Sequence, residues 1–138
     1  MKIFLDTNIV VDYLAHREGF FEEASIIFEL IYRNEVKAFV SSLTIINCAY
    51  VMRKFYPKEL VHEKLSAILE RIHITAIDED CIITALQSKP YDFEDFVQYL
   101  SARKINSDII ITRVKKGFRD VDVKVMTPHD FIQHCKKE

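Results

Sequence analysis

The sequence predicts an α/β fold, a three-layer α/β/α sandwich with a mostly parallel central sheet. Two observations favour this class. First, the apolar runs at residues 3–5 and 109–111 end in the polar residues Asp6 and Thr112, which is typical of strands buried on both faces. Second, short apolar runs alternate with longer segments of helical periodicity, and no repeat or low-complexity segment interrupts them.

Each element has a local signal. Runs rich in β-branched residues predict strands at residues 2–5, 37–40, 72–77, 108–112 and 121–126. Apolar residues spaced three or four apart, together with capping residues, predict helices at residues 9–14, 20–34, 41–55, 57–69, 78–87, 92–104 and 127–135. The whole chain, residues 1–138, suits a single domain with one core.

The predicted helix at residues 41–55 has almost no polar face, so we expect it to be buried on all sides. One amide, Asn47, lies inside its apolar run. A buried amide without a hydrogen-bond partner costs about 1–3 kcal/mol. Asn47 is therefore expected either to tie down a neighbouring backbone group or to point into a polar cavity.

Composition narrows the function classes. The net charge of −2 gives no global basic field of the kind that attracts nucleic acid, so any such binding needs a local patch. No apolar run approaches the roughly 20 residues that span a bilayer, and we expect no membrane contact. The three widely separated residues Cys48, Cys81 and Cys135 favour buried thiols in a reducing, cytoplasmic setting.

Asp6 comes directly after the first predicted strand. In open α/β sheets, ligands bind just beyond the carboxyl ends of the strands. A carboxylate there is costly to desolvate unless a partner such as a metal ion or a helix N-terminus offsets its charge. The alternative is that Asp6 and Thr7 only cap the helix that follows.

Asp92 and Asp95 lie three residues apart at the start of another helix, on one side of it. Acids in a first turn also cap the helix and complement its dipole, which is the alternative interpretation. If Asp92 and Asp95 met Asp6 at the strand edge, beside Thr112, the three carboxylates would need a cation to stay ionised. Oxygen ligands favour Mg²⁺ or Mn²⁺. Two such ions about 3.5–4 Å apart would clamp a phosphodiester and activate a water.

An ordered set of segments covers nearly the whole chain and resembles the PIN domain family. The segments are Ile3–Asn8, Ser41–Lys54, Asp92–Asp95, Ile109–Arg113, Lys115–Lys116, Phe118 and Val125–Pro128. PIN domains resemble metal-dependent ribonucleases, and many bacterial ones are toxins of VapBC-type toxin–antitoxin pairs. The resemblance implies Asp6 and Asp95 as metal ligands with Asp92 nearby and Asn8 assisting. It also implies an RNA substrate, an antitoxin partner and a homodimer.

Three positions depart from the family pattern. Most PIN nucleases carry a glutamate where this chain has Asn47, although a subgroup of small bacterial members uses asparagine. The pattern has Asn or Asp where Val114 stands, and Asp where Gly117 stands. Fewer anionic ligands imply weaker metal binding, with one ion instead of two.

These observations leave two main hypotheses. One is a Mg²⁺- or Mn²⁺-dependent endoribonuclease in which Asp6, Asp92, Asp95, Asn8, Asn47 and Thr112 form the site. The other is a degenerate PIN module that binds RNA or a protein without cleavage. A phosphohydrolase with an aspartyl nucleophile is disfavoured because Asn8 stands where a second acid is needed.

Basic residues gather in the last third of the sequence. They either bind RNA phosphates by charge or form an ordinary solvated surface. They are Arg103, Lys104, Arg113, Lys115, Lys116, Arg119 and Lys124. No base-stacking motif is visible in the sequence.

Overall fold

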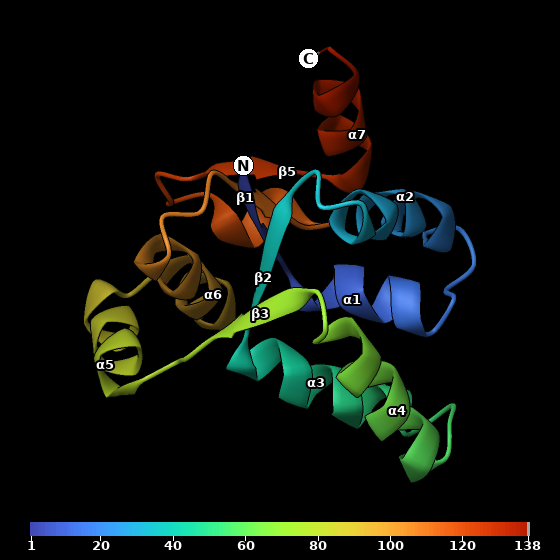
Figure 1. The fold of residues 1–138 in the computed structure, drawn as a ribbon. Helices are drawn as coiled ribbons and strands as arrows, with labels where there is room; N and C mark the ends of the chain where they lie inside the picture. Colours follow the sequence, from blue (N-terminus) through green and yellow to red (C-terminus); the bar gives the residue numbers. More distant parts are fainter. Residues whose placement is uncertain (138) are drawn as a thin grey trace.

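The computed structural model describes residues 1–137, and within them five parallel strands form one sheet in the order β3-β2-β1-β4-β5 (Figure 1). The strands are β1 (Lys2–Leu5), β2 (Lys37–Ser41), β3 (Ile72–Thr75), β4 (Ile109–Ile111) and β5 (Lys124–Met126). The predicted fold class is confirmed. The last strand is shorter than predicted, because residues 121–123 do not join the sheet.

Helices cover both faces of the sheet. One face carries α1 (Thr7–Leu14), α2 (Phe21–Tyr32), α3 (Ser42–Met52), α4 (Lys58–Ile68) and α7 (Pro128–Lys136). The other carries α5 (Glu79–Ser88), α6 (Phe93–Lys104) and the short 3₁₀ helix η1 (Lys115–Phe118) (Figure 1). No helix of residues 1–137 is long and apolar enough to cross a membrane.

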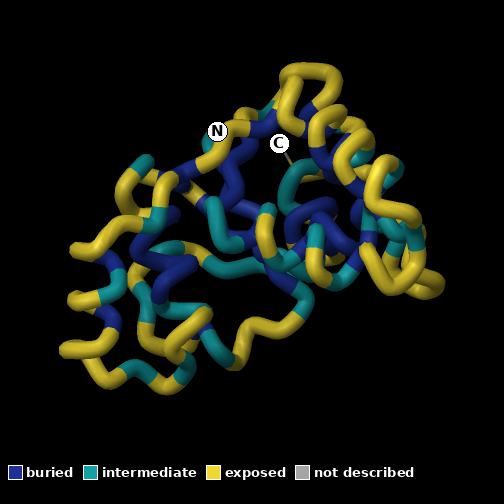
Figure 2. Tube along the Cα trace, turned by 90° about the horizontal axis from the view of Figure 1, so that it is seen from below, coloured by how far each residue is buried: buried dark blue, intermediate teal, exposed yellow. Residues whose placement is uncertain are grey.

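The central strands are buried because both of their faces meet a helical layer. Ile3 and Leu5 of β1 point into the core under α1 to α4, while Phe4 points into the core under α5 and α6. All three side chains are fully buried, as are Ile110 and Ile111 of β4. Figure 2 shows buried, dark blue segments in the interior and exposed, yellow segments around them.

Helix α3 differs from the prediction. It was expected to be buried on all sides, but Ile46 and Tyr50 are 66% and 56% exposed, so that prediction was wrong. The helix packs against α1 and α4 through the face that carries Thr44, Cys48 and Met52, and no element covers the opposite face within the described chain. Exposed apolar residues grouped in this way are typical of a surface that meets another protein.

The sheet gathers several polar residues at one edge. Because every strand is parallel, β1, β2 and β4 end on the same side, at Asp6, Ser41 and Thr112. Asp6 and Ser41 are also the N-caps of α1 and α3, so two helices begin at this edge. The backbone N–H of Asp6 donates to the carbonyl of Ile111 at 3.0 Å, which holds the ends of β1 and β4 together.

Candidate acidic site at the carboxyl edge of the sheet

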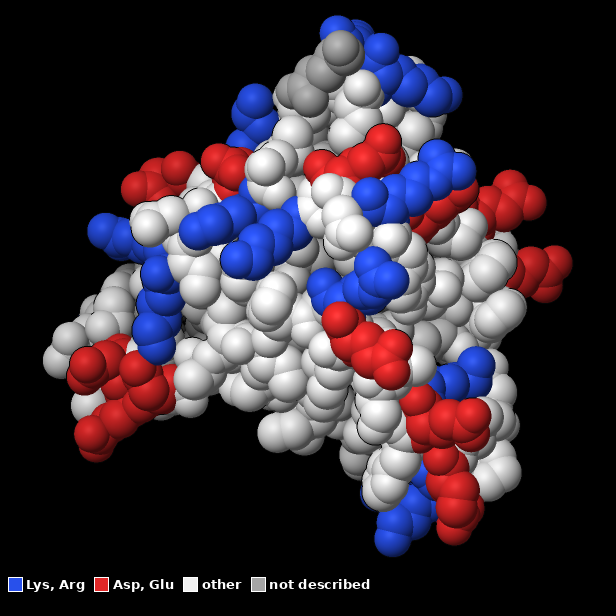
Figure 3. Space-filling view, viewed as in Figure 1, with Lys and Arg blue, Asp and Glu red and all other residues white. Residues whose placement is uncertain are grey.

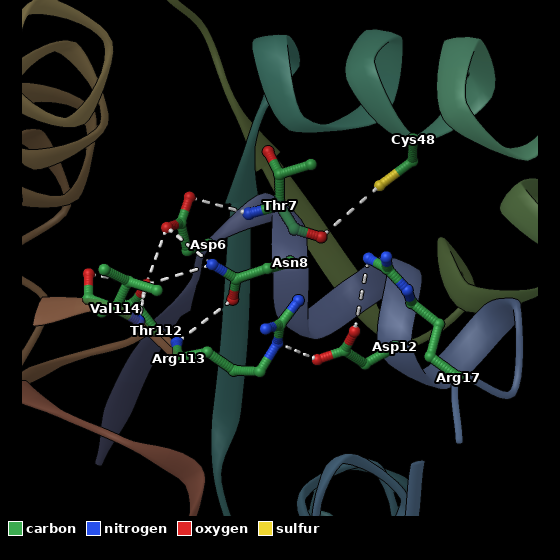
Figure 4. A network of polar contacts seen from close by, with 9 residues as sticks. All are labelled: Asp6, Thr7, Asn8, Asp12, Arg17, Cys48, Thr112, Arg113 and Val114. Atoms are coloured by element: carbon green, nitrogen blue, oxygen red, sulfur yellow. Dashed lines mark hydrogen bonds and ion pairs between the residues drawn. The ribbon is translucent and has the colours of Figure 1, made fainter. Parts of the chain in front are cut away.

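Asp6 lies at the centre of a hydrogen-bond network (Figure 4). Its Oδ1 accepts from the Thr7 backbone N–H at 2.8 Å and from Gln98 Nε2 at 3.1 Å. Its Oδ2 accepts from Thr112 Oγ1 at 2.9 Å and, more weakly, from Asn8 Nδ2 at 3.5 Å. The capping interpretation is therefore correct, since Asp6 caps α1, but the carboxylate also receives three side-chain donors.

Gln98 is a site residue that sequence reasoning missed. It lies on α6, is fully buried, and bridges three elements. Its Nε2 donates to Thr44 Oγ1 at 2.8 Å as well as to Asp6, and the hydroxyl of Ser41 donates to its Oε1. The available signal was an amide between the buried residues Val97 and Tyr99, where an unsatisfied polar group is costly.

The start of α6 supplies the other acids. Asp92 is the N-cap, and its Oδ1 accepts from the Asp95 backbone N–H at 2.9 Å, as the capping interpretation predicts. Burial raises the pKa of Asp95 to about 7, and the negative charges of Asp6, Asp92 and Glu94 add to the rise. Burial and the charges of Asp6 and Asp92 also raise the pKa of Glu94. The ends of β1 and the first turn of α6 thus share one negative field.

Asn47 connects α3 to this acidic cluster. It is half-buried, and its Nδ2 donates to Glu94 Oε1 at 3.3 Å. Its partner is a carboxylate and not a neighbouring backbone group, so the interpretation of Asn47 as a tie to the backbone was wrong. The amide donation opposes the rise in the pKa of Glu94.

The loop after β4 is held by a buried ion pair. Arg113 Nε lies 2.6 Å from Oδ2 of Asp12, a side chain that is only 1% exposed, and the guanidinium lies 4.0 Å from the centre of the Phe20 ring. The Arg113 backbone N–H donates to Asn8 Oδ1 at 3.2 Å, which orients the Asn8 amide toward Asp6 and Thr112 (Figure 4). Burial raises the pKa of Asp12, and Arg113 opposes the rise. Among residues 1–137, Oδ1 of Asp12 has no hydrogen-bond partner; the nearby Arg17 Nη1 lies 3.8 Å away.

The two departures after Thr112 have different surroundings. Val114 is 58% exposed, so the position that carries Asn or Asp in the PIN pattern has an apolar side chain in water here. Gly117 packs directly against Asp95: a Cβ atom at Gly117 would lie 1.7 Å from Asp95 Oδ2. The Asp95 carboxylate therefore occupies the space where the side chain of residue 117 would otherwise begin.

The donor set suits a hard divalent cation. Asp6 and Asp95 offer carboxylate oxygens that repel one another, and a cation between them would offset that repulsion. Within residues 1–137, however, no three His, Cys, Asp or Glu side chains are arranged as a ligand group. The ligand set Asp6, Asp92 and Asp95 thus stays a prediction, and Mg²⁺ or Mn²⁺ is the cation that these oxygens would fit.

Several of the basic residues proposed as a substrate grip have carboxylate partners. Lys104 pairs with Asp78 at 2.7 Å, Arg113 pairs with Asp12, and Lys115 lies 3.5 Å from Asp130. On the face shown in Figure 3, blue and red side chains lie among one another and form no continuous basic stripe. Any binding of a polyanion must therefore depend on a local group of basic side chains.

Comparison of solved structures shows the same fold in toxin–antitoxin proteins. VapBC2 of Rickettsia felis, bound to a DNA fragment from its promoter, has a TM-score of 0.69 and 23% identity over 92% of this chain and 98% of that chain. A toxin–antitoxin complex from Klebsiella pneumoniae has a TM-score of 0.67 and 22% identity over 91% and 97%. VapC20 of Mycobacterium tuberculosis, a toxin that cleaves the sarcin–ricin loop, has a TM-score of 0.62 and 11% identity over 78% and 86%.

Sequence comparison identifies the family directly. No curated protein sequence gave a significant match. The family profile described as the PIN domain matches residues 2–116, which include both strand ends, Asp6 and Thr112, and the acidic first turn of α6. The chain therefore belongs to the PIN domain family.

Proposed function

We propose that this protein is a divalent-metal-dependent endoribonuclease that hydrolyses RNA phosphodiester bonds and acts as the toxin of a toxin–antitoxin pair. The observation that carries the proposal is the shared negative field of Asp6 and Asp95, from two distant segments of the chain. That field raises the pKa of Asp95 to about 7, chiefly through burial and then through Asp6. Perturbed acids gathered at the ligand-binding edge of a parallel sheet are typical of active sites.

Each site residue has a role in this proposal. Asp6 and Asp95 would hold the cation with Asp92 nearby, and Thr112 and Gln98 orient the Asp6 carboxylate by donating to its two oxygens. When bound, Mg²⁺ or Mn²⁺ supplies charge stabilisation at the phosphate and lowers the pKa of a water. Asn8, held by the Arg113 backbone N–H, assists at Oδ2.

A protein partner has support from both the comparisons and the surface. Relatives with this fold occur as VapBC and other toxin–antitoxin complexes. Helix α3 exposes Ile46 and Tyr50, and a cleft of about 930 Å³ lies between α3 and α4. We propose that the chain forms a homodimer in the cytoplasm and binds an antitoxin protein, as its resemblance to PIN toxins implies.

A second candidate function is favoured by Val114 and Gly117. With an exposed valine at one expected ligand position and no side chain at the other, the chain offers fewer anionic ligands than the family pattern. A PIN module of this kind would bind RNA or a protein partner without cleaving RNA.

RNA cleavage under metal titration separates the two candidates. A nuclease cleaves single-stranded RNA in Mg²⁺ or Mn²⁺ and not in EDTA, and Asp6→Asn and Asp95→Asn each abolish cleavage. Asp78→Asn is the matched control, because Asp78 caps α5 as Asp6 caps α1 and asparagine also caps well. Cleavage that survives both site changes would place the site elsewhere. No cleavage by wild type with any divalent ion would favour the binding module.

A further inference from the structure

An aromatic ring with two cations over it lies beside the acidic site. Tyr91 immediately precedes the α6 cap Asp92, and its side chain is 51% exposed. The guanidinium carbon of Arg119 lies 3.7 Å from the centre of the Tyr91 ring, and Lys116 Nζ lies 5.8 Å from it. These three residues, the Tyr91 cluster, bring the start of α6 together with η1.

The Tyr91 cluster adjoins the acidic site through two backbone segments. On one side, Tyr91 is bonded to Asp92, whose carboxylate caps α6. On the other, Lys116 is bonded to Gly117, whose Cβ position would lie 1.7 Å from Asp95 Oδ2. A nucleic-acid strand that reached the acids from the side of η1 would pass within side-chain reach of Lys116 and Arg119.

The charges of the Tyr91 cluster are available to an anion. Among residues 1–137, no carboxylate forms a salt bridge with Lys116 or Arg119, in contrast to Lys104, Arg113 and Lys115. Arg119 Nε donates to the Lys116 carbonyl at 3.3 Å, and this bond holds the guanidinium over the ring. Lys116 and Arg119 lie close to a group of carboxylates, yet no carboxylate pairs with them in the described chain. Their free charges point to a polyanion as the ligand.

We propose that the Tyr91 cluster binds one unpaired nucleotide of single-stranded RNA, with the base stacked on the face of the Tyr91 ring that Arg119 leaves open and a phosphate beside Lys116 and Arg119. The proposal rests on the proposed function, because it takes RNA as the substrate. Stacking of a base on an aromatic side chain contributes about 1–3 kcal/mol and tolerates any base. A duplex keeps its bases paired, so the cluster selects single strands.

The test is binding of a fluorescein-labelled single-stranded oligouridylate in EDTA, followed by fluorescence anisotropy. Tyr91→Ala should weaken binding about tenfold, while Tyr91→Phe, which keeps the ring, should bind as wild type does. Arg119→Gln should weaken binding and lower the slope of log K against log salt by about 0.7, the loss of one phosphate contact to a single strand. Binding of a duplex of equal length should not depend on Tyr91.

Arg71→Gln is the matched control. Arg71 lies 5.9 Å from the Tyr32 ring at the opposite edge of the sheet, so its replacement removes the same charge from the same kind of pair. Its affinity should equal that of wild type. Equal losses in Arg71→Gln and Arg119→Gln would overturn the proposal, as would wild-type affinity in Tyr91→Ala or the absence of any RNA binding by wild type.

Cleavage measured in Mn²⁺ distinguishes failure of this proposal from failure of the nuclease function. Binding that depends on Tyr91 without cleavage would support the nucleotide subsite and contradict the nuclease. Cleavage by wild type together with wild-type affinity in Tyr91→Ala would support the nuclease and overturn the subsite.

Discussion

At the scale of single residues, the acidic site makes the stability of the folded protein depend on pH. The pKa of Asp95 is about 7 in the folded protein because of burial and of the charges on Asp6, Asp92 and Glu94, against an ordinary value of 3.8. Between these values the folded chain keeps a proton that the unfolded chain releases. Stability is therefore lost as the pH rises from about 4 to 7.

Asp95→Asn removes the loss of stability that ionisation of Asp95 causes at high pH. Without metal, we expect the variant to exceed wild type in the free energy of unfolding at pH 8 by on the order of 2 kcal/mol, with a difference near zero at about pH 4. Urea unfolding at both pH values measures it. Asp130→Asn is the control, because the pKa of Asp130 is lowered, chiefly by Thr127, and its replacement should give no gain at pH 8. Equal stability of Asp95→Asn and wild type at pH 8 would contradict this account of the site.

The pair of Asp12 and Arg113 gives a second prediction at this scale. Arg113→Met leaves Asp12, 1% exposed, without its 2.6 Å partner, and should lower the free energy of unfolding at pH 7 by about 3 kcal/mol. The loss should shrink toward pH 5, because the unpaired Asp12 then binds a proton. Arg17→Met removes only the more exposed partner at 3.8 Å and should cost about 1 kcal/mol or less. Thermal and urea unfolding measure the loss in the free energy of unfolding for both variants. Equal losses would refute the prediction.

At the scale of elements, the packing of η1 against α6 sets the position of Asp95. Phe118 is buried in the core under α6 and anchors η1, while Gly117 leaves room for the Asp95 carboxylate. The site therefore depends on a residue that contributes no ligand of its own.

Gly117→Ala tests this dependence. Its Cβ would meet Asp95 Oδ2 at 1.7 Å, so the carboxylate must turn away, and we expect Mn²⁺ affinity to fall about tenfold, measured by calorimetry. Gly19→Ala is the control: beyond its chain neighbours, no atom of the described residues lies within 4 Å of its Cβ position, but its φ of 88° strains an alanine. That variant should lose about 1 kcal/mol of stability and no metal affinity. Unchanged affinity in Gly117→Ala would separate Asp95 from metal binding.

The positions of the elements could be predicted because their signals are local. Asp6, Asp78, Asp92 and Thr127 cap the helices that they were expected to begin. The exposure of Ile46 on α3 could not be predicted, because periodicity shows that a helix has apolar residues and not which neighbours cover them.

The candidate site was predictable only in part. Asp6 and Thr112 follow from two strand ends that must share an edge, and their hydrogen bond confirms that they meet. The bridge through Gln98 depends on how α6 lies across β1 and β2, and the contact between Gly117 and Asp95 depends on the path of η1. These are tertiary relations: the local sequence shows an amide, Gln98, between Val97 and Tyr99, but it does not show which groups that amide contacts.

At the scale of the whole molecule, net charge is small and the exposed apolar face of α3 is the clearest surface for another protein. We expect the chain to form a dimer in solution, with a mass twice 16.2 kDa by light scattering. Ile46→Lys should give a monomer, whereas Ile26→Lys, at a 41% exposed position on α2, should leave the mass unchanged. A dimer that withstands Ile46→Lys would exclude this face as the interface.

The proposed function requires that Asp6, at the end of β1, and Asp95 of α6 share one cation. The most direct measurement is an anomalous difference map from crystals of the wild-type protein soaked in Mn²⁺. We predict a peak within coordination distance, about 2.0–2.3 Å, of both Asp6 and Asp95. A peak bound to other residues, or none beside Asp6 at saturating Mn²⁺, would contradict it.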